Sequence, residues 1–111
     1  MNKIKLAALQ LQLDKTDNLD FLLLQLNDLV KNRDDLDIII LSELAVGGAG
    51  AKNCSHPLSK YEKIFSEFAK NNSIYLIPGT FYEEYENKVF NVAPVFNGEG
   101  KLIAKAKKIY P

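Results

Sequence analysis

Hydrophobic positions along this chain repeat in two ways, and the changes between them divide it into predicted strands and helices. A period of two residues is typical of strands, and steps of three and four residues are typical of amphipathic helices. Segments with a period of two, or with a short apolar run, predict five strands. They cover Lys3–Leu13, Asp37–Leu44, Ile74–Tyr82, Lys88–Phe96 and Lys101–Tyr110.

A first segment with helical spacing follows the first strand. We expect Thr16 or Asp17 to cap its N-terminus, and Lys31 and Arg33 to interact favourably with the helix dipole at its other end. Additional apolar residues widen its stripe, which hints at contact with a second layer or another subunit. The regular stripe is Leu19, Leu22, Leu23, Leu26, Leu29 and Val30, and the additional residues are Phe21 and Leu24.

A second helix is predicted between the second and third strands. Its N-terminus is assigned to the capping box Ser59–Glu62, and Asn71 and Asn72 are expected to end it. The loop that precedes it, roughly residues 45–58, is rich in Gly, Ala, Asn and Ser. The predicted buried stripe of this helix is Tyr61, Ile64, Phe65, Phe68 and Ala69.

The order of these elements predicts an α/β fold with the arrangement β-α-β-α-β-β-β. Asp37–Leu44 is apolar on both alternating faces, which suits a central parallel strand covered by helices on either side. Asn97–Gly100 has the composition of a hairpin turn, so the last two strands are expected to pair antiparallel.

Composition narrows the class of protein. The length suits one domain, residues 1–111, and contents of 47% hydrophobic and 25% charged residues exclude disordered, collagen-like and disulfide-rich classes. Fourteen basic and fourteen acidic residues cancel, which argues against a nucleic-acid partner. Cys54 has no second cysteine to pair with, and no apolar stretch of signal or membrane-spanning length follows Met1. We therefore expect a cytoplasmic protein without a membrane partner.

Two charged residues are the candidate catalytic groups. Glu43 lies where the apolar strand Asp37–Leu44 ends and a glycine-rich loop begins, and ligand crevices of α/β folds lie at the carboxyl ends of such strands. A carboxylate there suits a general base. Strict alternation in Lys101–Tyr110 places Lys108 on the apolar, inward face with Leu102, Ala104, Ala106 and Tyr110, away from the other lysines of the segment. An ammonium on that face can stabilise an oxyanion. The alternative for both residues is a solvated charge at a strand end.

Other candidate motifs are weaker. Cys54 and His56 lie two residues apart in a loop, and nothing in the sequence orients the imidazole, so a solvated loop is preferred to a thiol-imidazole pair. A metal site would need a third ligand at a recognisable spacing, and we predict neither metal nor cofactor. Gly47–Lys52 lacks the Gly-Lys-Ser/Thr ending of a phosphate-binding loop and is interpreted as flexible.

The whole ordered pattern resembles the N-terminal half of the nitrilase superfamily, the carbon-nitrogen hydrolases. Ser42 stands where the family usually has proline, and Tyr110 and Pro111 stand where it usually ends in His-Leu. The similarity covers nearly all of the chain. It is carried by Ile4–Gln10, Asp37–Leu44, Ile77–Phe81, Val89–Ala93 with Phe96–Leu102, and Ala106–Pro111.

The resemblance implies half of an αββα sandwich and a Glu-Lys-Cys mechanism acting on a small amide, nitrile or carbamoyl compound. Glu43 would be the general base and Lys108 would stabilise the oxyanion. The family's nucleophilic cysteine lies on a later strand, and Cys54 does not match that position. Residues 1–111 are therefore expected to be the N-terminal part of a hydrolase domain that stops before the nucleophile and is inactive alone.

Two alternatives remain open. One is a non-catalytic α/β interaction module from a shortened gene, and the other is a small nucleotide-binding domain. Half of a sandwich would leave apolar surface uncovered, so we expect a homo-oligomer or a complementing C-terminal half as partner.

Overall fold

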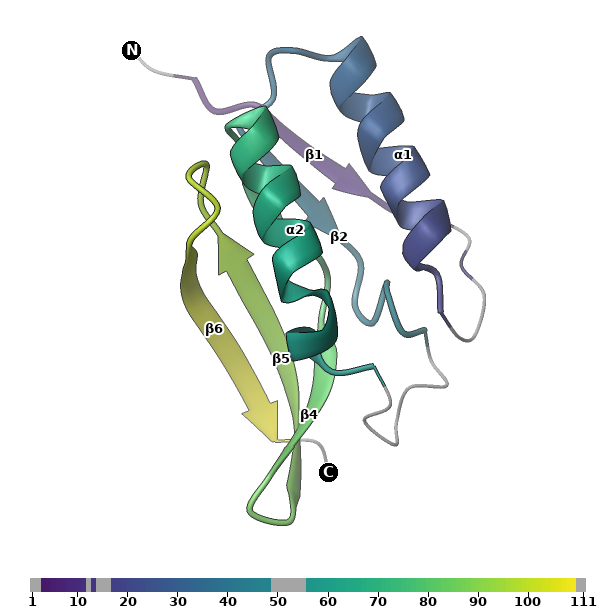
Figure 1. The fold of residues 1–111 in the computed structure, drawn as a ribbon, viewed down its shortest axis with the longest axis vertical. Helices are drawn as coiled ribbons and strands as arrows, with labels where there is room; N and C mark the ends of the chain where they lie inside the picture. Colours follow the sequence, from purple (N-terminus) through teal and green to yellow (C-terminus); the bar gives the residue numbers. More distant parts are fainter. Residues whose placement is uncertain (1–2, 12, 14–16, 49–55, 110–111) are drawn as a thin grey trace.

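The structure is a computed structural model and describes residues 3–11, 13, 17–48 and 56–109. It consists of six strands and two helices within this part of the chain (Figure 1). The strands are β1 (Leu6–Leu9), β2 (Ile38–Leu41), β3 (Tyr75–Ile77), β4 (Phe81–Tyr85), β5 (Lys88–Phe96) and β6 (Leu102–Ile109), and the helices are α1 (Leu19–Asn32) and α2 (Leu58–Asn72).

All six strands belong to one mixed sheet. β1, β2 and β3 are parallel, with Ile39 of β2 opposite Ala7 of β1 and Leu76 of β3. β5 is antiparallel to β3, β4 and β6. Because β6 pairs along one edge of β5 from Phe90 to Phe96, β3 and β4 share the other edge. The predicted α/β class, the central parallel strand and the antiparallel extension are confirmed. The expected helices on either side of β2 are wrong, because α1 and α2 both cover one face of the sheet.

The predicted strand Ile74–Tyr82 is wrong as a single element. Pro78 and Gly79 separate β3 from β4, and Gly79 has a φ of 84°, outside the strand region. The sheet therefore has one more strand than expected.

The main core lies between the sheet and the two helices, which cover the same face (Figure 1). Leu22 and Leu26 of α1 and Phe65 of α2 are fully buried against residues such as Ile39 and Leu76 of the sheet. The predicted stripe of α2 is confirmed at Tyr61, Phe65, Phe68 and Ala69, whereas Ile64 is exposed. In α1, Phe21 and Leu24 are exposed as well.

The predicted helix starts need correction. α1 begins at Leu19 with Asn18 in the N-cap position, and the Asn18 side chain donates to Ala45 O instead of capping the helix. Asp17, one of the two expected caps, accepts a hydrogen bond from Leu19 N–H over 3.4 Å. α2 begins at Leu58 with Pro57 in the N-cap position, so Ser59 lies inside the first turn and forms no capping box. Thr16 lies outside the described residues.

The face of the sheet opposite the helices is exposed at β1 and β3 within the described part of the chain, whereas Tyr82 of β4 on this face is buried. Leu6 and Tyr75, from β1 and β3, are 56% and 45% exposed on it. Ile38, Ile40, Ala93 and Val95 lie on the same face by strand alternation and are half-buried. An apolar sheet face of this kind is typical of one half of a sandwich.

Candidate active site

Glu43 begins a tight turn directly after β2. The turn is held by Ala45 N–H, which donates to Ser42 O, and by Gly48 N–H, which donates to Leu44 O over 2.7 Å. Leu44 has a φ of 53°, which is uncommon for a bulky residue and requires support from its surroundings. Its N–H supplies part of that support by donating to Thr80 Oγ1 over 3.0 Å.

Two other segments fix this turn against the rest of the molecule. Asn18, which is buried, donates its side-chain N–H to Ala45 O and its backbone N–H to Val46 O. From the other side, Gly79 lies so close to Ser42 O that a Cβ at position 79 would overlap this oxygen. The backbone that carries Glu43 is therefore held from both sides, while the Glu43 side chain itself is exposed.

Asn91 of β5 reaches the Glu43 carboxylate. Its Nδ2 donates to Glu43 Oε2 over 3.0 Å, so a central residue of β5 contacts the turn at the end of β2. The Oδ1 atom of Asn91 is buried and has no hydrogen-bond partner among the described residues. The glutamate therefore lies beside an amide whose acceptor atom is unused.

Lys108 lies directly opposite Asn91 in the pairing of β5 with β6. Ala106 and Ala104 pair with Ala93 and Val95 on the same face, whereas Lys107 and Lys105 pair with Val92 and Pro94 on the helix-covered face. The predicted separation of Lys108 from Lys105 and Lys107 is confirmed, but the prediction that Lys108 lies on the inward face is wrong, because the helices cover the other face. Lys108 is exposed, as Glu43 is, so the structure brings both to one open patch of the sheet and not into an enclosed cavity.

Leu102 departs from the predicted alternation. Ala104 pairs with Val95 but Leu102 pairs with Phe96, so Ile103 is an extra residue in β6. This irregularity turns Leu102 towards the core, where it packs against buried residues of the helix-covered face. The predicted placement of Leu102 on the same face as Lys108 is therefore wrong.

Sequence reasoning did not single out Asn91 as a site residue. A signal was present, since Asn91 is the only polar residue between Val89 and Phe96. On a strand whose other side chains are apolar, an amide is typical of a position that meets a specific polar partner.

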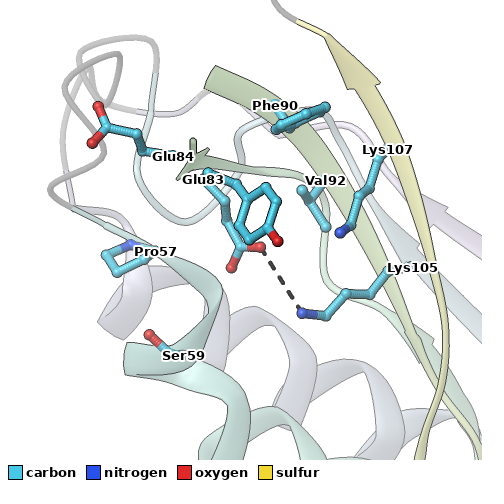
Figure 2. Close-up of a pocket in the computed structure, with 9 residues that line it drawn as sticks. Pro57, Ser59, Glu83, Glu84, Phe90, Val92, Lys105 and Lys107 are labelled. Atoms are coloured by element: carbon cyan, nitrogen blue, oxygen red, sulfur yellow. Dashed lines mark ion pairs between the residues drawn. The ribbon is translucent and has the colours of Figure 1, made fainter. Parts of the chain in front are cut away.

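A separate pocket lies on the helix-covered side of the sheet (Figure 2). Its volume is about 360 Å³, and Pro57 and Ser59 at the start of α2 form one of its walls. Lys105 Nζ approaches Glu83 Oε1 to 3.9 Å across it, and Lys107 also lines it. Glu43 and Lys108 are not among its lining residues, so this pocket is distinct from the surface that carries Glu43, Asn91 and Lys108.

His56 is better oriented than the sequence indicated. Its Nδ1 is hydrogen-bonded to Tyr61 Oη at 2.6 Å, and the two rings stack with centroids 6.2 Å apart. The expectation that nothing orients His56 is therefore wrong. Cys54 lies outside the described residues, as do residues 49–52 of the glycine-rich loop. Within the described ranges, no three His, Cys, Asp or Glu side chains are grouped as metal ligands, and no helix is long and apolar enough to cross a membrane.

Residues 5–111 match the carbon-nitrogen hydrolase family, and the chain belongs to that family. The resemblance to the nitrilase superfamily is thereby confirmed.

Characterised relatives agree with this assignment. A hydrolase from Schizosaccharomyces pombe is 32% identical over 97% of this chain, which spans 35% of that protein. An omega-amidase from Mus musculus is 47% identical over 40% of this chain, and the match covers 16% of its length. The chain thus spans about a third of the length of the first of these relatives.

Solved structures share the fold. Nit3 from Saccharomyces cerevisiae, a member of branch 10 of the nitrilase superfamily, matches 96% of this chain and 44% of its own, with a TM-score of 0.78 and 25% identity. A carbon-nitrogen hydrolase from Helicobacter pylori matches 95% of this chain and 39% of its own, with a TM-score of 0.82 and 17% identity. An amidase from Nesterenkonia sp., solved as a mutant with butyramide, has a TM-score of 0.76 and 15% identity over 95% of this chain and 42% of its own.

Proposed function

We propose that residues 1–111 supply the general base and the oxyanion-stabilising cation of a hydrolase that cleaves non-peptide carbon-nitrogen bonds in amides, nitriles or carbamoyl compounds. The observation that carries the proposal is the position of Asn91, which contacts Glu43 and pairs with Lys108. An acid and an amine that are distant in sequence thus flank one residue on one face of the sheet.

Glu43 is proposed as the general base. It would accept the proton of a cysteine thiol, and the resulting thiolate would attack the carbonyl carbon of an amide. The rigid backbone around Glu43 supports this role, because a base must be held within hydrogen-bond reach of the proton that it removes. Its exposed carboxylate is open to a nucleophile arriving from the uncovered side of the sheet.

Lys108 is proposed to stabilise the oxyanion that forms on the carbonyl oxygen during this attack. When the tetrahedral intermediate collapses, the proton held by Glu43 would pass to the leaving nitrogen, and ammonia would depart from a primary amide. Water would then attack the thioester, with Glu43 again accepting a proton, to release the carboxylic acid and regenerate the thiol.

The nucleophilic cysteine is proposed to come from outside residues 1–111, as the resemblance implies. It would have to approach the uncovered face of the sheet, since Asn91 and Lys108 both lie on that face. On this proposal residues 1–111 alone do not turn over substrate, and the complete protein does. The expected partner is a complementing C-terminal half or a further copy of the chain.

Ammonia release from butyramide and other short aliphatic amides by the complete protein tests the assignment. We expect Glu43→Gln to lower kcat by about 10²–10⁴-fold, which is the typical contribution of a positioned general base. The matched control is Glu83→Gln, because Glu83 is a half-buried carboxylate of the same sheet that lies on the opposite face. Comparable activity in both variants would defeat the assignment of Glu43.

The alternative is a non-catalytic interaction module, and the exposed apolar residues Leu6 and Tyr75 favour it. A module of this kind would bind a partner through the uncovered face and hydrolyse no amide. Sedimentation of the chain measures whether it self-associates, as an exposed apolar sheet face predicts. Self-association is expected under either function, and a well-dispersed monomer would count against an interaction surface there.

A further inference from the structure

We propose that Asn91 is a positioning residue that links Glu43 to Lys108, donating through Nδ2 to the carboxylate and accepting through Oδ1 from the ammonium. This inference rests on the proposed function, because it assigns the means by which the acid and the amine of that mechanism are held in one place.

The orientation of the Asn91 amide follows from the chemistry of its partner. An ionised carboxylate only accepts hydrogen bonds, so the NH₂ group of Asn91 must face Glu43, as it does at 3.0 Å. The carbonyl end of the amide must then point elsewhere. Glu43 thereby fixes both ends of the Asn91 side chain.

The carbonyl end is left in a costly state. Oδ1 of Asn91 is buried and unpartnered among the described residues. A buried acceptor without a donor costs about 1–3 kcal/mol, and nearly all such atoms in proteins have partners. The site is therefore poised to receive a donor at this atom.

Lys108 is one of the two donors that the sheet places directly opposite Asn91. Side chains directly opposite in an antiparallel pair have Cβ atoms about 4.5–5.5 Å apart, and a lysine side chain is long enough to fold back over such a neighbour. Lys105 and Lys107 lie on the other face. The residue that faces Asn91 from β4 is Tyr82, whose hydroxyl is the competing donor.

The amide also keeps the two charges apart. A direct ion pair would occupy the carboxylate and the ammonium with each other. A neutral amide between them holds each by one hydrogen bond and leaves the remaining donors and acceptors for substrate and nucleophile. Loss of the amide is expected to misplace both groups and to affect the reaction more than substrate binding.

The link is tested first without catalysis, by recording the side-chain amide resonances of Asn91 in the ¹⁵N-labelled chain. We expect Lys108→Met and Glu43→Gln each to move these resonances, and Lys107→Met, one residue away on the opposite face, to leave them in place. Equal shifts for Lys108→Met and Lys107→Met, or a shift only with Tyr82→Phe, would overturn the link.

The kinetic test uses two nearly isosteric variants of the complete protein, Asn91→Thr and Asn91→Val. Of the two replacements, only threonine carries a hydroxyl, which can both donate and accept a hydrogen bond. We expect kcat to fall about 100-fold in Asn91→Val with KM nearly unchanged, and threonine to recover about tenfold of that loss at equal thermal stability. Equal kcat values in the two variants would contradict a positioning role. Since the resonance shifts do not require turnover, failure of hydrolysis alone would count against the proposed function and not against this link.

Discussion

Gly79 lies against the carbonyl oxygen of Ser42, at a distance that leaves no room for a Cβ atom. This contact joins the segment after β3 to the residue that immediately precedes Glu43. The φ of Gly79 is 84°, in the left-handed region that favours glycine, so both the backbone conformation and the lack of space require glycine at this position. The geometry of the Glu43 turn thus depends on a position far from it in sequence.

Gly79→Ala is therefore expected to destabilise the fold by about 1–3 kcal/mol, and to shift the Glu43 turn. Urea unfolding gives the free energy of unfolding, and Gly98→Ala is the control. At Gly98 the nearest atom to an added Cβ would be Ser73 C at 3.2 Å, and the backbone is not left-handed. A Gly79→Ala variant as stable as Gly98→Ala would contradict the close contact with Ser42.

The helix-covered core gives a second prediction. Leu26 is fully buried on α1, whereas Leu24 on the same helix is 65% exposed. Leu26→Ala should cost about 2–5 kcal/mol because it leaves a cavity, and Leu24→Ala should change stability by no more than about 0.5 kcal/mol. Denaturant unfolding of both variants checks this. A large cost for Leu24→Ala would mean that another part of the protein covers that side chain.

A surface cluster gives the pH-dependent prediction. The Asp35 carboxylate accepts hydrogen bonds from Arg33 Nε and Lys5 Nζ, each over 3.0 Å. The bond from Arg33, followed by that from Lys5, lowers the pKa of Asp35 well below its usual value and raises that of Arg33. A lowered folded-state pKa means that the stabilisation is present above the unfolded value and is lost as the pH falls through the folded value.

Asp35→Asn should therefore be less stable than the original chain at pH 7, and the difference should shrink below about pH 4, where the unfolded carboxyl takes up its proton. The effect is small because the group is at the surface. Thermal unfolding at pH 7 and at low pH measures it, with Asp34→Asn as the control. A difference that grows as the pH falls would have the wrong sign for this mechanism.

Much of the fold follows from local patterns of hydrophobicity. The period-two pattern and the apolar run at residues 38–41 correctly predicted the order of strands and helices along the chain, apart from the split into β3 and β4, and β5 was predicted with its observed bounds. The split between β3 and β4 was missed because Pro78 and Gly79 interrupt a run that stays apolar on both sides. The extra residue Ile103 was missed because a bulge changes pairing and leaves no mark in composition.

The candidate site was predicted only where local patterns in the sequence point to it. Position at a strand end pointed to Glu43, and alternation separated Lys108 from Lys105 and Lys107. The contact between Asn91 and Glu43 depends on how β5 is placed relative to β2, with β3 between them, and no local pattern encodes that placement. The start of α1 was missed by one residue, because Asn18 holds the N-cap position while its side chain bonds to Ala45 O, a tertiary contact that the local sequence does not encode.

The central claim is that Glu43 and Lys108 act together on one face of the sheet, and a comparison of adjacent lysines tests it most directly. The measurement is ammonia release from butyramide by the complete protein as Lys108→Met and as Lys107→Met. The two residues are neighbours in β6 but lie on opposite faces. We predict that Lys108→Met lowers kcat by about 10²–10³-fold and that Lys107→Met leaves it nearly unchanged. Equal activity in the two variants, or a loss only in Lys107→Met, would contradict the account.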